Sequence, residues 1–104
     1  MITASFTTRN GKIQKFRVSG HSGYAESGSD IVCAAVSAMV MLTVNTVTDD
    51  FGIPAAVKVE EEDAVIELLL KTEDERAHAL IAGLMREISA LAHDFPDNVR
   101  VIVK

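Results

Sequence analysis

The chain has one cysteine among its 104 residues, two prolines and no tryptophan. A single cysteine cannot form a disulfide within the chain, so we expect a reducing compartment and a cytoplasmic protein. The N-terminus lacks the basic segment and apolar run of a signal peptide. The longest apolar run, residues 31–42, is short for a membrane span of about 20 residues, so we expect no membrane partner.

Basic residues are also few, because 10 Lys and Arg stand against 15 Asp and Glu, for a formal net charge of −5. Proteins that bind a phosphate backbone show a basic patch or stripe, so we expect no direct contact with nucleic acid. An acidic chain suits a partner with basic segments, although many acidic surfaces serve solubility alone. The length and the apolar fraction of 48% predict one folded domain over residues 1–104.

Metal and phosphate motifs are missing as well. His78 and His93 lie 15 residues apart, and with one cysteine in the chain they make no zinc pattern. Gly20, Gly23 and Gly28 lack the spacing and the following lysine of a phosphate-binding loop. We therefore expect neither a metal nor another cofactor.

Apolar periodicity predicts an α+β fold with the element order ββαββαβ, in which two helices pack on a mainly antiparallel sheet. The first predicted helix is apolar on nearly all sides, and the second begins at a capping box of Thr72 and Glu75. The predicted strands cover residues 2–8, 13–19, 56–60, 64–70 and 99–103, and the first helix covers about 31–49.

Asn10-Gly11 predicts a hairpin between the first two strands. A two-residue loop would place the apolar side chains of the two strands on opposite faces of the sheet. A three-residue loop that includes Arg9 pairs Ala4 with Phe16 and places them on one face. We therefore predict the three-residue loop, with Gly11 in the left-handed conformation at a bulge.

The chemistry is concentrated in residues 20–37, which read Gly-His-Ser-Gly-Tyr-Ala-Glu-Ser-Gly-Ser-Asp-Ile-Val-Cys-Ala-Ala-Val-Ser. His21 follows a strand, and Cys33 falls in the first turn of a helix that Ser29 or Asp30 caps. A helix N-terminus and a nearby imidazolium both favour a thiolate, which is the nucleophilic form of cysteine. Free amides of that turn, with a loop amide, would suit an oxyanion.

The same residues have plain structural interpretations. A lone cysteine on an apolar helix is usually a small core residue, and Asp30 is most simply a helix cap. A histidine after a strand is more often hydrogen-bonded than catalytic. Spacing alone therefore leaves both interpretations open.

Gly20-His21 and the segment Asp-Ile-Val-Cys-Ala-Ala-Val-Ser at 30–37, with a glycine-bearing loop between them, closely resemble the Prp family of ribosomal-processing cysteine proteases. The likeness extends over essentially the whole chain in length and element order. It implies a cysteine endopeptidase that removes a short N-terminal extension from a large-subunit ribosomal protein, number twenty-seven in that series. It also implies a homodimer.

The resemblance further implies that Cys33 is the nucleophile, that His21 is the base and then the acid, and that Asp30 supports them. The loop between the two catalytic positions, residues 22–29, is expected to cover the substrate. Ser22 stands where the family pattern has alanine. The expected substrate-loop residues are Gly20, Ser22, Gly23, Tyr24, Gly28 and Ser29.

The alternative is a non-catalytic dimeric module that binds a basic segment of a ribosomal protein. It predicts stoichiometric binding, no cut product and no effect of replacing Cys33, whereas a purely structural domain predicts no sensitive site at all. Whether a third group orients His21 also stays open, with Asp30, Ser37 or a backbone carbonyl as candidates.

Overall fold

The computed structural model describes residues 1–104, apart from the side chain of Ser27. The predicted order ββαββαβ is confirmed. A 3-10 turn, η1 (Ser27–Ser29), precedes the first helix, and a π-helical turn, η2 (Thr46–Asp50), extends it. The remaining elements are β1 (Ile2–Arg9), β2 (Lys12–Ser19), α1 (Ile31–Asn45), β3 (Ala55–Glu60), β4 (Val65–Leu70), α2 (Glu75–Asp94) and β5 (Val99–Val103).

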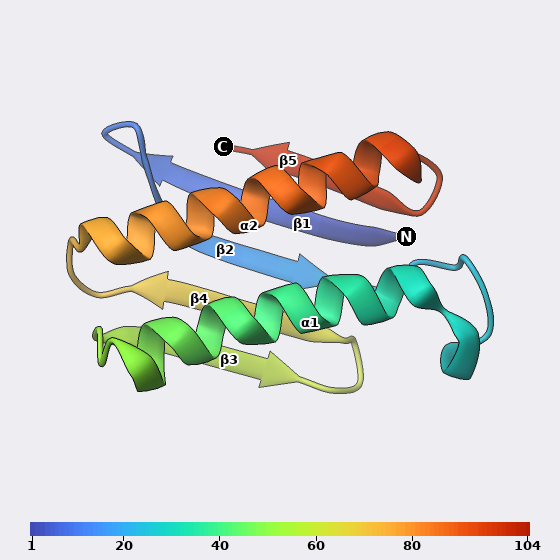
Figure 1. Ribbon diagram of the computed structural model, residues 1–104, viewed down its shortest axis with the longest axis horizontal. Coiled ribbons are helices and arrows are strands. Elements are labelled where there is room, and N and C mark those ends of the chain that lie inside the picture. Colours follow the sequence, from blue (N-terminus) through green and yellow to red (C-terminus); the bar gives the residue numbers. More distant parts are fainter.

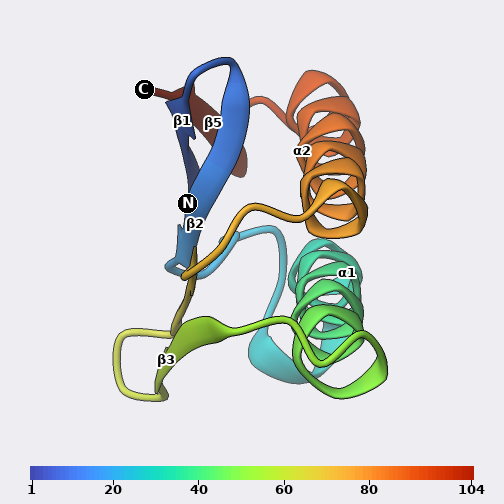
Figure 2. The same ribbon diagram turned by 90° about the vertical axis from the view of Figure 1, so that its left-hand side faces the viewer.

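The fold has two layers, as the α+β prediction requires. The sheet has the strand order β3-β4-β2-β1-β5, and both helices cover one of its faces (Figures 1 and 2). The β1–β5 pair is parallel and the other three pairs are antiparallel. Because β1 and β5 run in parallel, their first residues lie at the same end of the sheet, beside the loop that leads into α1 (Figure 1).

The hairpin prediction is wrong in its loop and right in its outcome. Asn10 and Gly11 both have positive φ, at 54° and 78°, and they form a two-residue turn that pairs Arg9 with Lys12. A β-bulge then shifts the register beside Thr7, so that Phe16 pairs with Phe6 and not with Ala4 as predicted. The bulge brings the apolar side chains of both strands to the helix side, which is what we expected the longer loop to do.

Helix α1 begins at Ile31, as predicted, and its core-facing valines contribute much of the packing against the sheet. Ile31 and Leu42 are nevertheless exposed, at 61% and 66%. The helix is therefore apolar on its outer face as well as its inner face, in agreement with the sequence pattern. The α1 residues in the core are Val32, Val36, Val40 and Val44.

By length and composition, the segment Ile31–Asp50 could cross a membrane, with a mean hydropathy of 1.9. This differs from our expectation, which considered only residues 31–42. The helix continues through the π-helical turn, and this continuation supplies the missing length. The core helix of a soluble protein passes the same test, and the inner face of α1 packs in the core of this domain.

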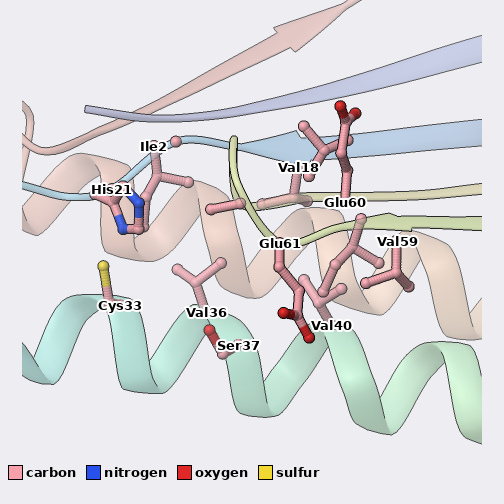
Figure 3. Close-up of a pocket in the computed structure, with 14 residues that line it drawn as sticks. Ile2, Val18, His21, Cys33, Val36, Ser37, Val40, Val59, Glu60 and Glu61 are labelled. Atoms are coloured by element: carbon pink, nitrogen blue, oxygen red, sulfur yellow. The ribbon is translucent and has the colours of Figure 1, made fainter. Parts of the chain in front are cut away.

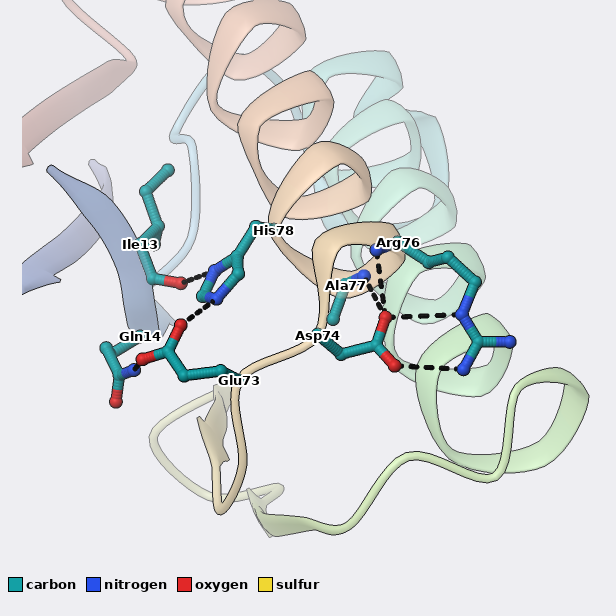
Figure 4. A network of polar contacts seen from close by, with 7 residues as sticks. All are labelled: Ile13, Gln14, Glu73, Asp74, Arg76, Ala77 and His78. Carbon is teal, nitrogen blue, oxygen red and sulfur yellow. Dashed lines mark hydrogen bonds and ion pairs between the residues drawn. The ribbon is translucent and has the colours of Figure 1, made fainter.

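The capping box predicted at Thr72 is absent, because α2 begins later, at Glu75, with Asp74 as its cap. The Asp74 carboxylate accepts hydrogen bonds from the amides of Arg76 and Ala77, at 2.8 and 3.3 Å (Figure 4). The Arg76 side chain bonds to the same carboxylate and is the main cause that lowers the Asp74 pKa to about 2. An ionised cap satisfies two amides that Thr72 stands too early in the chain to reach.

Candidate active site

His21 and Cys33 come from different elements and meet at one end of the molecule. His21 lies two residues beyond the end of β2, and Cys33 lies in the first turn of α1. Figure 3 shows the imidazole ring and the sulfur pointing toward one another across the gap between the loop and the helix. The His21 side chain is exposed and Cys33 is partly buried, so solvent reaches the pair.

Asp30 caps α1, so the structure selects it over Ser29. One of its carboxylate oxygens, Oδ1, accepts a hydrogen bond from the Cys33 amide at 2.9 Å, and Oδ2 accepts one from the Ser22 hydroxyl. These contacts, with Ser22 the larger, lower the Asp30 pKa to about 2. These bonds fasten the loop to the start of α1, and among the described residues no hydrogen bond joins Asp30 to the His21 ring.

Ser22, one of the expected loop residues, makes hydrogen bonds through its amide, its hydroxyl and its carbonyl. Its side chain is buried, with 2% exposure. Its amide donates to the Cys33 sulfur at 3.2 Å, and its hydroxyl oxygen accepts from the Tyr24 amide at 3.1 Å. Its carbonyl accepts from Asn98 Nδ2 at 2.9 Å. The hydroxyl bonds to Asp30 and to the Tyr24 amide are the ones that the alanine of the family pattern could not make.

The other expected loop residues spread along the surface. Gly23 and Gly28 are exposed, and Ser29 closes the η1 turn by donating from its amide to the Glu26 carbonyl at 2.8 Å. The Tyr24 ring stands edge-on against Phe95, with 5.4 Å between ring centroids. Phe95 lies just after α2, so this contact docks the loop on the connection to β5.

The expected oxyanion donors are partly occupied. The Cys33 amide donates to Asp30 Oδ1, and the Ala34 amide donates to the Asp30 carbonyl at 3.1 Å. These two amides of the first turn are therefore not free. The loop contributes the Ser22 amide, which donates to the Cys33 sulfur.

A pocket of about 250 Å³ opens beside the pair and runs along α1 toward the β3–β4 turn (Figure 3). Its walls are mostly apolar, and Ser37, Glu60 and Glu61 add polar groups. Sequence patterns showed the valines only as core or strand residues, so their place in a pocket was missed. The apolar walls come from Ile2, Val18, Val36, Val40, Val59, Ala64, Val65 and Ile66.

Among the residues that the structure describes, no three His, Cys, Asp or Glu side chains gather to hold a metal ion. His78 bonds to residues other than His21 and Cys33. Its Nδ1 bonds to the Ile13 carbonyl at 3.1 Å, and its Nε2 lies 2.7 Å from Glu73 Oε2 (Figure 4). It joins α2 to the bulged part of β2.

The family model described as "Cysteine protease Prp" matches residues 1–100. The chain belongs to the Prp family of cysteine proteases. A Prp relative, the ribosomal processing cysteine protease of Bacillus subtilis, is 32% identical, with 97% of this chain and 96% of the relative covered. The corresponding Staphylococcus aureus protein is 23% identical over the full length of both chains.

Solved structures share the fold. The S. aureus ribosomal processing protease Prp with a covalently linked product peptide matches with a TM-score of 0.93 at 23% identity, and both chains are fully covered. The same protease with a substrate peptide gives a TM-score of 0.87 at 22% identity, again over both full chains. A Streptococcus mutans protein gives 0.86 at 30% identity, over 99% of this chain and 96% of its own. Membership of Prp makes this chain a cysteine protease and sets aside the non-catalytic alternative.

Proposed function

We propose that Cys33 is the nucleophile of this Prp protease and that His21 is its general base and acid. The observation that carries the proposal is that the only cysteine in the sequence faces the His21 ring at the mouth of a pocket. A cysteine protease needs a thiolate beside a proton acceptor, and this pair supplies both. The remaining histidines, His78 and His93, lie on α2.

The reaction follows from this arrangement. His21 takes the proton from the Cys33 thiol, and the sulfur attacks the carbonyl carbon of the scissile peptide bond. The protonated His21 then gives its proton to the leaving amine, which departs as a new N-terminus and leaves a thioester on Cys33. Water attacks the thioester with His21 again as base, so the acid product and the free thiol are released.

Asp30 supports this chemistry by position. Its carboxylate bonds both to the Cys33 amide and to the Ser22 hydroxyl, so it fixes the start of α1 against the loop. The loop of residues 22–29 covers the bound peptide, and Tyr24 is its docking side chain. No cofactor takes part in the mechanism, and residues 1–104 act as one catalytic domain.

The proposed substrate is the N-terminal extension of a large-subunit ribosomal protein, number twenty-seven. Relatives are named as ribosomal processing proteases, and the net charge of −5 complements the basic character of ribosomal proteins. The apolar pocket beside Cys33 suits apolar side chains next to the scissile bond. Glu60 and Glu61 at the pocket suit a basic residue further along the peptide.

We also propose a cytoplasmic homodimer. Ile31, Met41 and Leu42 expose apolar surface on α1, with exposures of 61%, 39% and 66%. A second copy of the chain would cover such a surface and remove it from water. Sedimentation measurements on the purified protein would give a mass of twice 11.2 kDa.

The function is tested by incubating the full-length ribosomal protein with the protease and measuring intact masses. We expect one shortened product with the unchanged chain. Cys33→Ala and His21→Ala should give none, whereas His93→Ala, which changes an exposed histidine on α2, should cut normally. A thioester of the released N-terminal peptide on Cys33 should appear after rapid acid quench.

Two results would overturn the proposal. One is continued cleavage by folded Cys33→Ala. The other is cleavage of unrelated basic proteins while the ribosomal protein stays intact. That result would show that the protease has a different substrate.

A further inference from the structure

The turn between α2 and β5 contacts the loop of residues 22–29 at two points. Phe95, at the start of this turn, packs against Tyr24, and Asn98, at its end, donates from its side chain to the Ser22 carbonyl. Ser22 and Asn98 are 76 residues apart in sequence. A contact over this separation appears only in the folded chain.

Asn98 is itself firmly held. Its amide donates to the Phe95 carbonyl at 3.0 Å, and its carbonyl accepts from the Ile2 amide at 2.9 Å. The second bond ties the turn to the start of β1, where the parallel pairing with β5 begins. Because both backbone groups of Asn98 are hydrogen-bonded, its backbone position is fixed, and its side-chain amide is held toward the Ser22 carbonyl.

Ser22 is thus bonded through three groups to two parts of the molecule, the turn before β5 and the start of α1. Its carbonyl meets Asn98, its hydroxyl meets Asp30, and its amide meets the Cys33 sulfur. The first two bonds fix the orientation of the residue, and the third is the one that touches a reacting atom. An N–H group aimed at a sulfur stabilises it more as a thiolate than as a thiol, because the negative charge strengthens the hydrogen bond.

We propose that Asn98 is a positioning residue for the protease reaction. It acts through Ser22, because its bond to the Ser22 carbonyl keeps the Ser22 amide directed at the Cys33 sulfur. The same bond restrains His21, the residue before Ser22, beside that sulfur. This inference rests on the proposed function, because it takes Cys33 as the nucleophile. Asn98 does not touch the reacting atoms and takes no part in proton transfer.

The test compares Asn98→Ala and Asn98→Asp with the unchanged chain. The aspartate variant keeps the size of the side chain but places an acceptor, in place of the donor, against the Ser22 carbonyl. Asp97→Ala is the matched control, because Asp97 is the exposed neighbour on the same turn. Two readouts are used for each variant: kcat and KM for the cleaved peptide, and the rate of Cys33 alkylation by iodoacetamide at pH 7.

For both Asn98 variants we expect kcat and the alkylation rate to fall about tenfold, as the loss of one hydrogen bond to a charged sulfur implies. KM should stay within about twofold, and the control should match the unchanged chain. Alkylation rates and kcat that equal those of the control would overturn the proposal. So would a loss that disappears when the variants are assayed at lower temperature, since that result marks a purely structural role.

Cleavage by Cys33→Ala, assayed beside the Asn98 variants, separates this inference from the proposed function. If Cys33→Ala still cuts the peptide, the proposed function fails, whatever the Asn98 variants do. If Cys33→Ala is inactive and the Asn98 variants are fully active, only the positioning role of Asn98 fails.

Discussion

The carbonyl oxygen of Met1 occupies the space in which a side chain on Gly20 would begin. Gly20 also has a φ of +91°, a conformation that side chains with a Cβ rarely adopt. Two features therefore restrict position 20 to glycine, namely its positive φ and the nearby carbonyl oxygen of Met1. This close approach fixes where the segment leaves β2 on its way to the site.

We expect Gly20→Ala to lower the free energy of unfolding by more than about 1 kcal/mol and to reduce kcat, because the backbone must move and carry His21 with it. Gly83→Ala is the control. Gly83 lies in α2 with room for a methyl group, so the same change there should raise stability by about 0.5–1 kcal/mol. Urea denaturation and peptide cleavage measure the two effects. Equal stability of the two variants would contradict the predicted overlap.

The Asp30 carboxylate predicts an acid-dependent part of the stability. Its pKa is lowered to about 2 in the folded chain, from about 3.9 when unfolded. A lowered folded pKa adds stability above the unfolded pKa, and this stability is lost as the pH falls from about 4 toward 2. The gap in unfolding free energy between the unchanged chain and Asp30→Asn should therefore be constant above about pH 5 and shrink below pH 4.

Urea titrations from pH 7 down to pH 2.5 measure that gap. Asp97→Asn, at an exposed position, serves as the comparison and should show no such narrowing. Asp74 has a similarly lowered pKa, but it is present in both chains and cancels in the difference. A gap that stays constant down to pH 2.5 would mean that the Ser22 and Cys33 bonds do not hold the ionised form.

Val59 tests whether the pocket binds the peptide. It lines the pocket from the edge strand β3, while Val57, two residues earlier on the same face, lies outside the lining. Val59→Asp should lower kcat/KM by about fivefold to tenfold, through the lost contact with an apolar side chain, mainly by raising KM. Val57→Asp should leave kcat/KM near normal. Peptide kinetics on the two variants decide the matter, and equal effects would place the peptide elsewhere.

His78 is predicted to matter for stability and not for catalysis. Its ring bonds to the Ile13 carbonyl and to Glu73, which also accepts a hydrogen bond from Gln14 at 2.6 Å (Figure 4). His78→Ala leaves the buried Ile13 carbonyl without its donor, at a cost of about 2 kcal/mol. His93→Ala, at a side chain with 90% exposure, should change stability by less than about 0.5 kcal/mol. A urea midpoint of His78→Ala equal to that of His93→Ala would refute this role.

Several features of the fold could be predicted because they rest on local patterns. Strand alternation, helical spacing and the turn signal of Asn10-Gly11 gave the order of elements and the outline of the sheet. The register of the hairpin could not be predicted, because no residue pattern near Thr7 indicates the bulge. The Ile13 carbonyl beside the bulge bonds to His78, which lies 65 residues further along the chain.

The candidate site likewise has residues that a local pattern predicts and residues that only the fold brings together. His21, Cys33 and Asp30 lie in one short segment whose pattern resembles a family, so the sequence alone could name them as candidates. Asn98 lies on a turn near the other end of the chain, and its contact with Ser22 depends on the parallel pairing of β1 with β5. Bonds that span the whole chain leave no local signature, and only the assembled sheet reveals them.

The position of the first residue also has a practical consequence for making the enzyme. Met1 touches Gly20, one residue before His21, while Lys104 bonds to Phe6 and Thr8 toward the opposite end of β1. Affinity tags or fusion partners placed ahead of Met1 would lie beside the pocket that Ile2, His21 and Cys33 line. The same additions after Lys104 would project from the far end of the sheet, away from that pocket.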